Sequence, residues 1–147
     1  MDSQIQAETI VGREFDTAAA RARKEMLEQE LERFLRILIE EGNPELILIF
    51  GSMVTGEIHE SSDIDLVVVE DSDLPFLPRT KQMRSMLKPQ IGTDILWYTP
   101  DEFNHMFHNR LFFRHEIVGK GKVLYERGDN TLDRLCQRRP ARSRVGH

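Results

Sequence analysis

The stretch IFGSMVTGEIHESSDIDLVVVE, residues 49–70, places two aspartates one residue apart at the start of an apolar run. Successive side chains of a β-strand point to opposite faces, so Asp63 and Asp65 share one face and Ile64 points to the other. Two carboxylates about 6.6 Å apart on one face repel each other and lose hydration when they are buried. The pair therefore requires a positive partner, either a basic side chain or a divalent cation.

The residue types around the pair favour a cation over a basic side chain. No Lys or Arg occurs between positions 51 and 78, and His59, interpreted here as a surface residue, is the nearest to a basic group. Ligand sets made only of oxygen suit Mg²⁺ or Mn²⁺ better than zinc. The alternative is that Asp63 lies exposed and caps a turn with Ser61 and Ser62. That alternative leaves Asp65, directly before Leu-Val-Val-Val, unexplained.

A third aspartate interrupts a later apolar segment in the same way. In IGTDILWY, residues 91–98, Asp94 stands before a run of large hydrophobic residues. If this strand lies beside the strand of Asp63 and Asp65, three carboxylates converge on one face of the sheet. Three carboxylates are enough to hold two divalent ions about 3.5–4 Å apart, the arrangement used in phosphoryl and nucleotidyl transfer.

A Gly-Ser pair closes the strand that precedes the two aspartates. Gly51 allows the backbone to approach a ligand closely, and Ser52 can donate its hydroxyl to a phosphate oxygen, as can the amides of a following helical turn. Taken alone, Gly-Ser is an ordinary turn signal. A Gly-Ser pair followed by ten residues and then Asp63-Ile64-Asp65 is a much rarer arrangement, and it suggests that the turn and the aspartates act together.

The rest of the chain alternates between strand and helix patterns. Leucines and Phe34 recur every three or four residues over 17–41, which predicts a long N-terminal helix ending at Gly42. Apolar runs predict strands over 46–50, 64–69, 91–98 and 122–126, and further helices are expected over 78–87, from 100 onward and over 109–118. Thr99 and Glu102 form a capping box at the second of these. The alternation predicts an α/β or α+β domain with a central sheet.

Length and composition fit one soluble domain over residues 1–147. We expect the core to span about residues 17–126 and residues 1–15 and 134–147 to be flexible. The single cysteine, Cys136, excludes an internal disulfide and fits a reducing compartment. The N-terminus lacks the apolar stretch of a signal peptide, and no apolar run approaches the roughly 20 residues of a membrane span. A cytoplasmic protein without membrane contact is therefore expected.

Charge is distributed unevenly along the chain. Residues 134–147 carry five arginines and no acidic residue, so a net charge of −5 leaves −10 on the rest. An acidic body is a poor general surface for nucleic acid, because phosphate contacts need Lys and Arg. The basic tail is interpreted as a solvated terminus; contact with RNA or with an acidic partner is the alternative.

The pattern from Gly51-Ser52 through Asp63-x-Asp65 to Asp94 resembles the minimal nucleotidyltransferases of the DNA polymerase beta superfamily. The resemblance covers about residues 45–126, and the segments 98–103 and 121–125 also look like small stand-alone members. It implies the nucleotidyltransferase fold, a small mixed central sheet flanked by helices. Small members of this kind resemble the antitoxin halves of toxin–antitoxin pairs, which adenylylate a tyrosine of a helical HEPN-type ribonuclease.

The resemblance also implies roles for the site residues. Asp63 and Asp65 would bind two Mg²⁺ ions and, through them, the triphosphate of ATP. Asp94 would bind the catalytic ion and accept the proton of the acceptor hydroxyl. Gly51 and Ser52 would grip the phosphates of the departing pyrophosphate. The acceptor oxygen attacks the α-phosphorus in line, so most of the catalysis comes from positioning and from neutralisation of charge.

One departure from the family pattern concerns the charge near the phosphates. Many relatives carry an arginine soon after Gly-Ser, whereas this chain has Met53-Val54-Thr55. The cation must then come from elsewhere in the chain, and the sequence does not choose among five candidates: Arg79, Lys81, Arg84, Arg114 and Lys120.

Three functions remain open at this point. The first is a Mg²⁺-dependent nucleotidyltransferase that uses ATP and modifies a protein, with a HEPN-type protein as partner. The second is a binding module with the same fold and little catalysis, which neutralises its partner by contact. The third is a transferase for RNA ends or a small-molecule hydroxyl, for which a homodimer would supply the missing wall of the acceptor site.

Overall fold

The computed structural model describes residues 17–137 and contains a four-stranded mixed sheet with the strand order β3-β2-β1-β4. Its strands are β1 (Leu46–Phe50), β2 (Ile64–Val69), β3 (Thr93–Tyr98) and β4 (Lys122–Glu126). Strands β2 and β3 run parallel, and β1 is antiparallel to both of its neighbours. The predicted mixed sheet and its four strands are confirmed, with β3 starting two residues later than expected.

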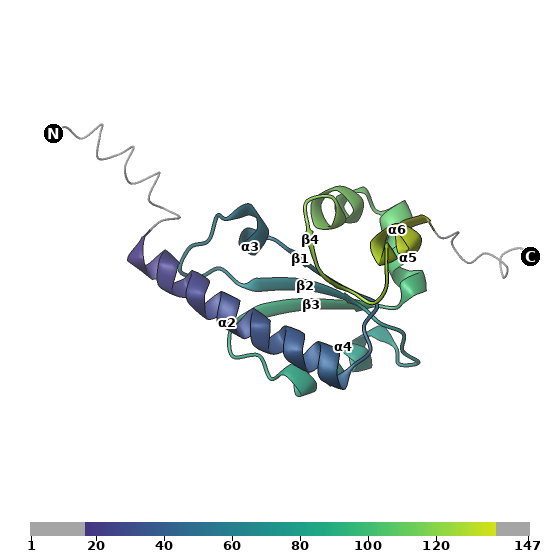
Figure 1. Ribbon diagram of the computed structural model, residues 1–147, viewed down its shortest axis with the longest axis horizontal. Coiled ribbons are helices and arrows are strands. Elements are labelled where there is room, and N and C mark those ends of the chain that lie inside the picture. The colour runs from purple at the N-terminus through teal and green to yellow at the C-terminus, as the bar shows by residue number, and fades with distance from the viewer. Residues whose placement is uncertain (1–16, 138–147) are drawn as a thin grey trace, which may run out of the picture.

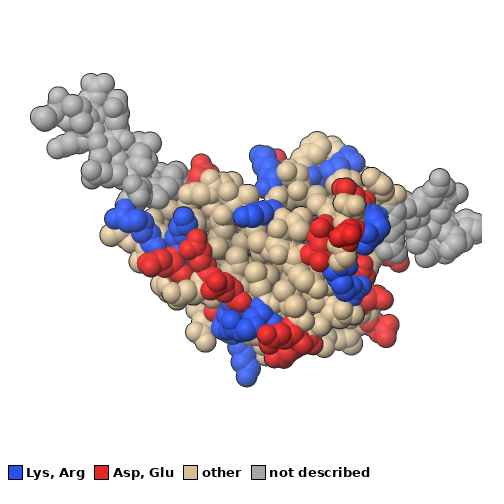
Figure 2. All heavy atoms as spheres, viewed as in Figure 1, with Lys and Arg blue, Asp and Glu red and all other residues tan. Residues whose placement is uncertain are grey.

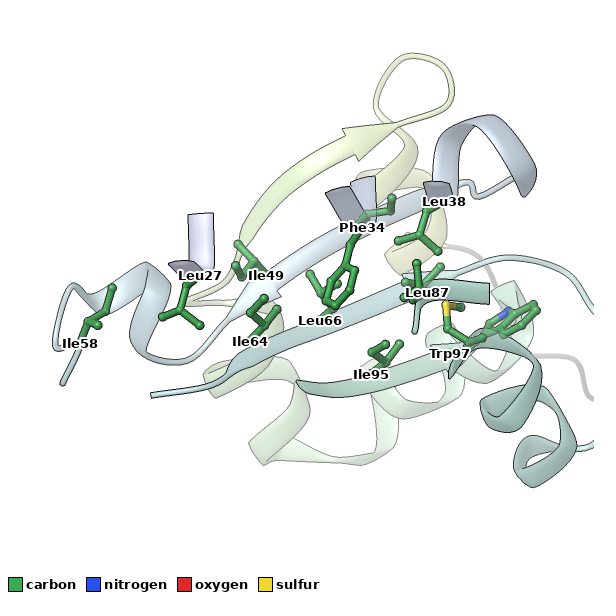
Figure 3. Close-up of a cluster of buried hydrophobic side chains, with 13 residues drawn as sticks. Leu27, Phe34, Leu38, Ile49, Ile58, Ile64, Leu66, Leu87, Ile95 and Trp97 are labelled. Carbon is green, nitrogen blue, oxygen red and sulfur yellow. The ribbon is translucent and has the colours of Figure 1, made fainter. Parts of the chain in front are cut away.

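Helix α2 (Ala18–Glu41) is the predicted long helix, and it lies diagonally across one face of the sheet (Figure 1). The Thr17 hydroxyl accepts a hydrogen bond from the amide of Ala20 at its start, and Gly42 ends it. Leu27, Phe34 and Leu38 are fully buried and pack against the even-numbered residues of β2 (Figure 3). Charged side chains of both signs follow the outer surface of the helix (Figure 2).

Helix α4 (Phe76–Leu87) covers the same face as α2, through the buried side chains of Met83 and Leu87. It begins two residues before the predicted start at Pro78. Proline is tolerated there because an amide in the first turn of a helix has no intrahelical partner to lose. Figure 1 shows α2 and α4 together on one side of the sheet.

The opposite face of the sheet is covered by α5 (Pro100–Asn109), η1 (Phe113–Val118) and α6 (Thr131–Gln137). The Thr99–Glu102 capping box is present at the start of α5, as predicted. The helix expected over 109–118 is shorter and wider, because η1 is a π-helix in which Gly119 donates to the carbonyl of Arg114. Helix α6 was not anticipated, and it extends the ordered structure into residues 134–137, where Leu135 is buried.

Strand β4 carries a bulge where it pairs with β1. Ile47 is opposite Tyr125 and the next residue, Leu48, is opposite Val123, so Leu124 has no counterpart. Strands β3 and β4 form the two edges of the sheet. Among the described helices, none combines the length and the hydrophobicity that crossing a membrane requires. The single-domain organisation stays a prediction, and the expected flexibility of residues 1–15 and 138–147 concerns positions outside the described residues.

We predict that Phe34→Ala lowers the free energy of unfolding by about 3–5 kcal/mol, because the buried ring would leave a cavity between α2 and the sheet. Met26, on the same helix, is 49% exposed, so Met26→Ala is the matched control and should change stability by less than about 1 kcal/mol. Urea denaturation measures both variants. Equal losses would show that α2 does not pack on the sheet as described.

Candidate active site

The sheet brings the predicted aspartates to one end of strands β2 and β3. Asp65 and Asp94 are register partners on these neighbouring parallel strands, so their side chains leave the sheet on the same face. It is the face that α5, η1 and α6 cover farther along the strands, through Val67 and Val69. Asp63 lies directly before β2, with a side chain that is 51% exposed. The structure therefore pairs Asp65 with Asp94 on one face of the sheet and places Asp63 at the start of the same strand, while a common metal site for all three carboxylates stays a prediction.

The three carboxylates interact electrostatically, and the interaction raises the pKa of Asp65. Burial, the negative charges of Asp94 and Asp63, and a hydrogen bond that protonated Asp65 donates to the carboxylate of Asp94 together raise the pKa of Asp65 to about 6. Asp94 is exposed but remains in contact with Asp65. The cluster thus has an excess of negative charge that a cation would relieve.

Gly51 is required by the aspartates as well as by the turn. Its φ of +81° lies in the region that favours glycine, and a methyl group on its Cα would overlap Oδ2 of Asp65. The close approach expected at Gly51 is therefore an approach to the carboxylate of Asp65. Gly51 follows β1 directly, and Phe50 at the end of β1 is the register partner of Asp65. The pairing of β1 with β2 therefore brings the Gly51 turn against the carboxylate of Asp65.

A second glycine has the same relation to Asp63. A methyl group on Gly92 would overlap Oδ1 of Asp63, and the carbonyl of Gly92 accepts a hydrogen bond from the amide of Ile64. Sequence reasoning missed Gly92. The available signal was its position two residues before Asp94, which becomes informative only when the two strands are known to be neighbours.

Helix α3 (Ser52–Thr55) is the short turn expected after Gly-Ser. It ends at Gly56, whose amide donates to the carbonyl of Ser52. The loop that follows is closed by Ser62, whose hydroxyl accepts from the amide of His59. Ser62 therefore closes this turn, a function that the alternative interpretation had assigned to Asp63, and Asp63 is placed beside the other carboxylates.

Helix α2 contacts both of the loops that carry the aspartates. Near its start, the Nε of Arg23 donates to the carbonyl of Ser62 at 2.8 Å. Farther along, the buried Glu30 carboxylate accepts from the amide of Gln90 at 2.7 Å. Arg33 binds Glu30 and donates to the carbonyl of Lys88 at 3.0 Å. The hydrogen bond from Arg33 holds the pKa of Glu30 below its usual range, so the carboxylate stays charged.

A family model described as "Polymerase beta, Nucleotidyltransferase" matches residues 32–130, which include all three aspartates and the Gly-Ser turn. The chain belongs to the polymerase beta nucleotidyltransferase family. The resemblance found in the sequence is confirmed, and the family is one of transferases.

The chain is also similar to individual proteins and solved structures. The chain is 28% identical over 107 residues to a protein named protein adenylyltransferase MntA from Aphanizomenon flos-aquae (strain 2012/KM1/D3). The aligned residues make up 71% of each of the two chains. The chain resembles the crystal structure of a putative nucleotidyltransferase from Sulfolobus solfataricus, with a TM-score of 0.55 and 14% identity over 76% of this chain and 91% of the other. A toxin–antitoxin structure with AMP-PNP aligns with a TM-score of 0.46 and 19% identity, over 72% and 80% of the two chains.

The five cations considered as substitutes for the missing arginine of this nucleotidyltransferase mostly have other partners. Arg79 is buried and bonded to Glu102, and Arg84 donates to the carbonyl of Thr93. The guanidinium of Arg114 lies 5.6 Å from the centre of the Phe107 ring, Lys120 pairs with Glu116, and Lys81 is exposed. Among the described residues, Arg23 alone forms an ion pair with one of the aspartates, at 3.5 Å from Asp63. Sequence reasoning did not consider Arg23, because its position depends on how α2 packs.

The donor atoms of this site fit a hard divalent cation. Asp63, Asp65 and Asp94 supply only carboxylate oxygens, and the raised pKa of Asp65 shows that their charges are not balanced within the cluster. Within residues 17–137, however, no group of three or more Asp, Glu, His or Cys side chains is arranged so that it could hold a metal ion. The chemistry of the ligands therefore fits Mg²⁺, while the three side chains would have to move closer together to bind it.

We predict that Gly51→Ala and Gly56→Ala differ in cost although both glycines have φ near +80°. No atom lies within 4 Å of a methyl group at Gly56, so that variant should lose only about 1 kcal/mol of stability to backbone strain. Gly51→Ala adds an overlap with Asp65 and should lose about 2 kcal/mol or more. Chemical denaturation compares the two, and equal losses would mean that Asp65 does not lie against Gly51.

We predict that Asp65→Asn stabilises the metal-free protein at about pH 7.5. The pKa of Asp65 is raised to about 6, so the folded chain holds its proton to higher pH than the unfolded chain. Stability therefore falls as pH rises from about 4 to 6, and the variant should regain on the order of 1–2 kcal/mol above that range.

The measurement is urea denaturation in EDTA from about pH 4 to 8, with exposed Asp73→Asn as the matched control. Asp73→Asn should follow the pH profile of the wild type. A profile of Asp65→Asn that also coincides with the wild type would contradict the electrostatic coupling described for the cluster.

Proposed function

We propose that the protein transfers AMP from ATP, with Mg²⁺, to a hydroxyl group of another protein. The observation that carries this proposal is the pairing of Asp65 with Asp94 on neighbouring strands, with Asp63 and the Gly51 turn in contact with the same cluster. Family membership supports nucleotidyl transfer in general. The name of the relative from Aphanizomenon, a protein adenylyltransferase, supports AMP as the transferred group and a protein as the acceptor.

In the proposed reaction, an acceptor oxygen forms a bond to the α-phosphorus of ATP as the bond to pyrophosphate breaks. Asp63 and Asp65 would hold two Mg²⁺ ions, and Asp94 one of them; bound there, the ions would neutralise the charge that develops on the phosphate oxygens. Asp94 is exposed, so it can reach the acceptor hydroxyl and accept its proton. The Gly51 turn and the Ser52 hydroxyl would contact the departing pyrophosphate.

The acceptor that we propose is a tyrosine of a helical HEPN-type toxin, for which this protein acts as the antitoxin. The sequence resemblance to minimal antitoxin-type nucleotidyltransferases supports this acceptor. Asp94 is exposed, so a hydroxyl group of another protein can approach its carboxylate.

A catalytically weak binding module is the second candidate. It is favoured by Met53-Val54-Thr55, which replaces the arginine found in many relatives, and by the lack of a preformed metal-binding group among residues 17–137. In that case the protein would neutralise its partner by contact alone, and the aspartates would not be needed for neutralisation.

We predict that label from [α-³²P]ATP appears on the partner only with Mg²⁺ and is reduced at least about 1000-fold by Asp65→Asn, because the substitution removes a charged ligand of the metal ions that would bind the reacting phosphates. The candidate partner is a small helical HEPN-type protein, purified with and without its tyrosines changed to phenylalanine. Asp73→Asn, an exposed carboxylate of the loop after β2, is the control and should retain full transfer.

The same assay separates the two candidates. Inhibition of the partner's ribonuclease activity is measured beside the labelling. If the wild type transfers no label, and Asp65→Asn inhibits the partner as well as the wild type does, the protein is a binding module and the transferase proposal is wrong.

A further inference from the structure

Arg23 is anchored at the edge of the aspartate cluster by a contact that does not involve the aspartates. Its Nε donates to the backbone carbonyl of Ser62 at 2.8 Å, which fixes the guanidinium beside the loop that leads into β2. The side chain is 20% exposed, so part of it is accessible to solvent. Figure 1 shows this loop passing the N-terminal part of α2.

The other nitrogens of the guanidinium are available for a ligand. Nη2 lies 3.5 Å from Oδ1 of Asp63, an ion pair that is longer than a hydrogen bond. Within residues 17–137, the terminal amino groups of Arg23 form no hydrogen bond, and this ion pair joins them to Asp63. An arginine that is held through Nε alone keeps a planar pair of donors, the geometry that binds phosphate oxygens.

The charge distribution around the cluster makes this position significant. No Lys or Arg occurs between positions 51 and 78, so neither the turn after Gly-Ser nor the loop before β2 brings a cation of its own. A nucleoside triphosphate carries several negative charges, and carboxylates that bind it through metal ions add more. A cation fixed next to Asp63 would offset the repulsion between this acidic edge and the phosphates.

We propose that Arg23 of α2 binds the triphosphate of the nucleotide substrate. This inference rests on the proposed nucleotidyl transfer and names the residue that holds the phosphates. Without nucleotide, the guanidinium contacts Asp63. When the nucleotide binds, Asp63 turns to the metal and the guanidinium, still held by Ser62, contacts the phosphate oxygens.

The experiment compares two affinities in the full-length protein by isothermal titration calorimetry: Mg²⁺ alone, and AMP-PNP in the presence of excess Mg²⁺. Arg23→Ala should weaken AMP-PNP binding about tenfold or more, the effect of a lost charge-assisted hydrogen bond. The affinity for Mg²⁺ alone should stay the same or increase, because the positive neighbour of Asp63 is gone. Arg23→Lys keeps the charge and should restore part of the AMP-PNP affinity.

Two further variants make the comparison specific. Arg36→Ala removes an exposed arginine from the same helix, about 20 Å farther along, and should leave both affinities unchanged. Arg23→Gln removes the charge and retains an amide that can donate to the Ser62 carbonyl, so it replaces Arg23→Ala if the alanine variant does not fold. Circular dichroism melting checks the folding of each variant.

The outcomes are distinct. Weaker AMP-PNP binding with unchanged or tighter Mg²⁺ binding supports a phosphate contact. Weaker binding of both ligands means that Arg23 only positions Asp63, and unchanged AMP-PNP binding means that it is only a counter-ion; either result overturns the inference. If the wild type itself binds no AMP-PNP with Mg²⁺, the proposed function fails as well, which separates that failure from a failure of Arg23 alone.

Discussion

The alignment of β2 with β3 is the constraint on which the site depends. Parallel pairing puts Asp65 directly beside Asp94, and the pleat turns both carboxylates toward one face. Two neighbouring negative charges destabilise the fold unless a cation neutralises them. Their repulsion is one of the causes of the raised pKa of Asp65. The pairing of two aspartates adds nothing to the stability of the sheet, which agrees with the cation site proposed there.

The surroundings of the carboxylates are built to tolerate the crowding. Gly51 and Gly92 each leave room for one carboxylate, and a side chain at either position would push it out of place. Helix α2 then secures the two loops: Arg23 holds the segment before β2, and the Glu30–Arg33 pair holds the segment before β3. The length of α2 has a physical reason in these contacts, because one rigid rod reaches both loops and the core between them.

Most of the fold and the composition of the site could be predicted from local patterns. The strands appear as short apolar runs, α2 as a helical repeat, and the start of α5 as a capping box, because each of these signals lies within a few residues. Helix α6 was missed because it is short and buries only one hydrophobic residue, Leu135, and the π-helical form of η1 was missed because it has no local signature. The positions of Arg23 and Gly92 depend on packing between segments that are distant in the sequence, and no local pattern contains that information.

The bulge at Leu124 has a consequence for how the molecule can assemble. Strand β4 lies at the edge of the sheet, where exposed backbone groups usually offer a template for a strand of another chain. An extra residue breaks the regular spacing of those groups and twists the edge. Growth of the sheet from one subunit into the next is therefore disfavoured along β4, and a partner that approaches from this side must bind through side chains.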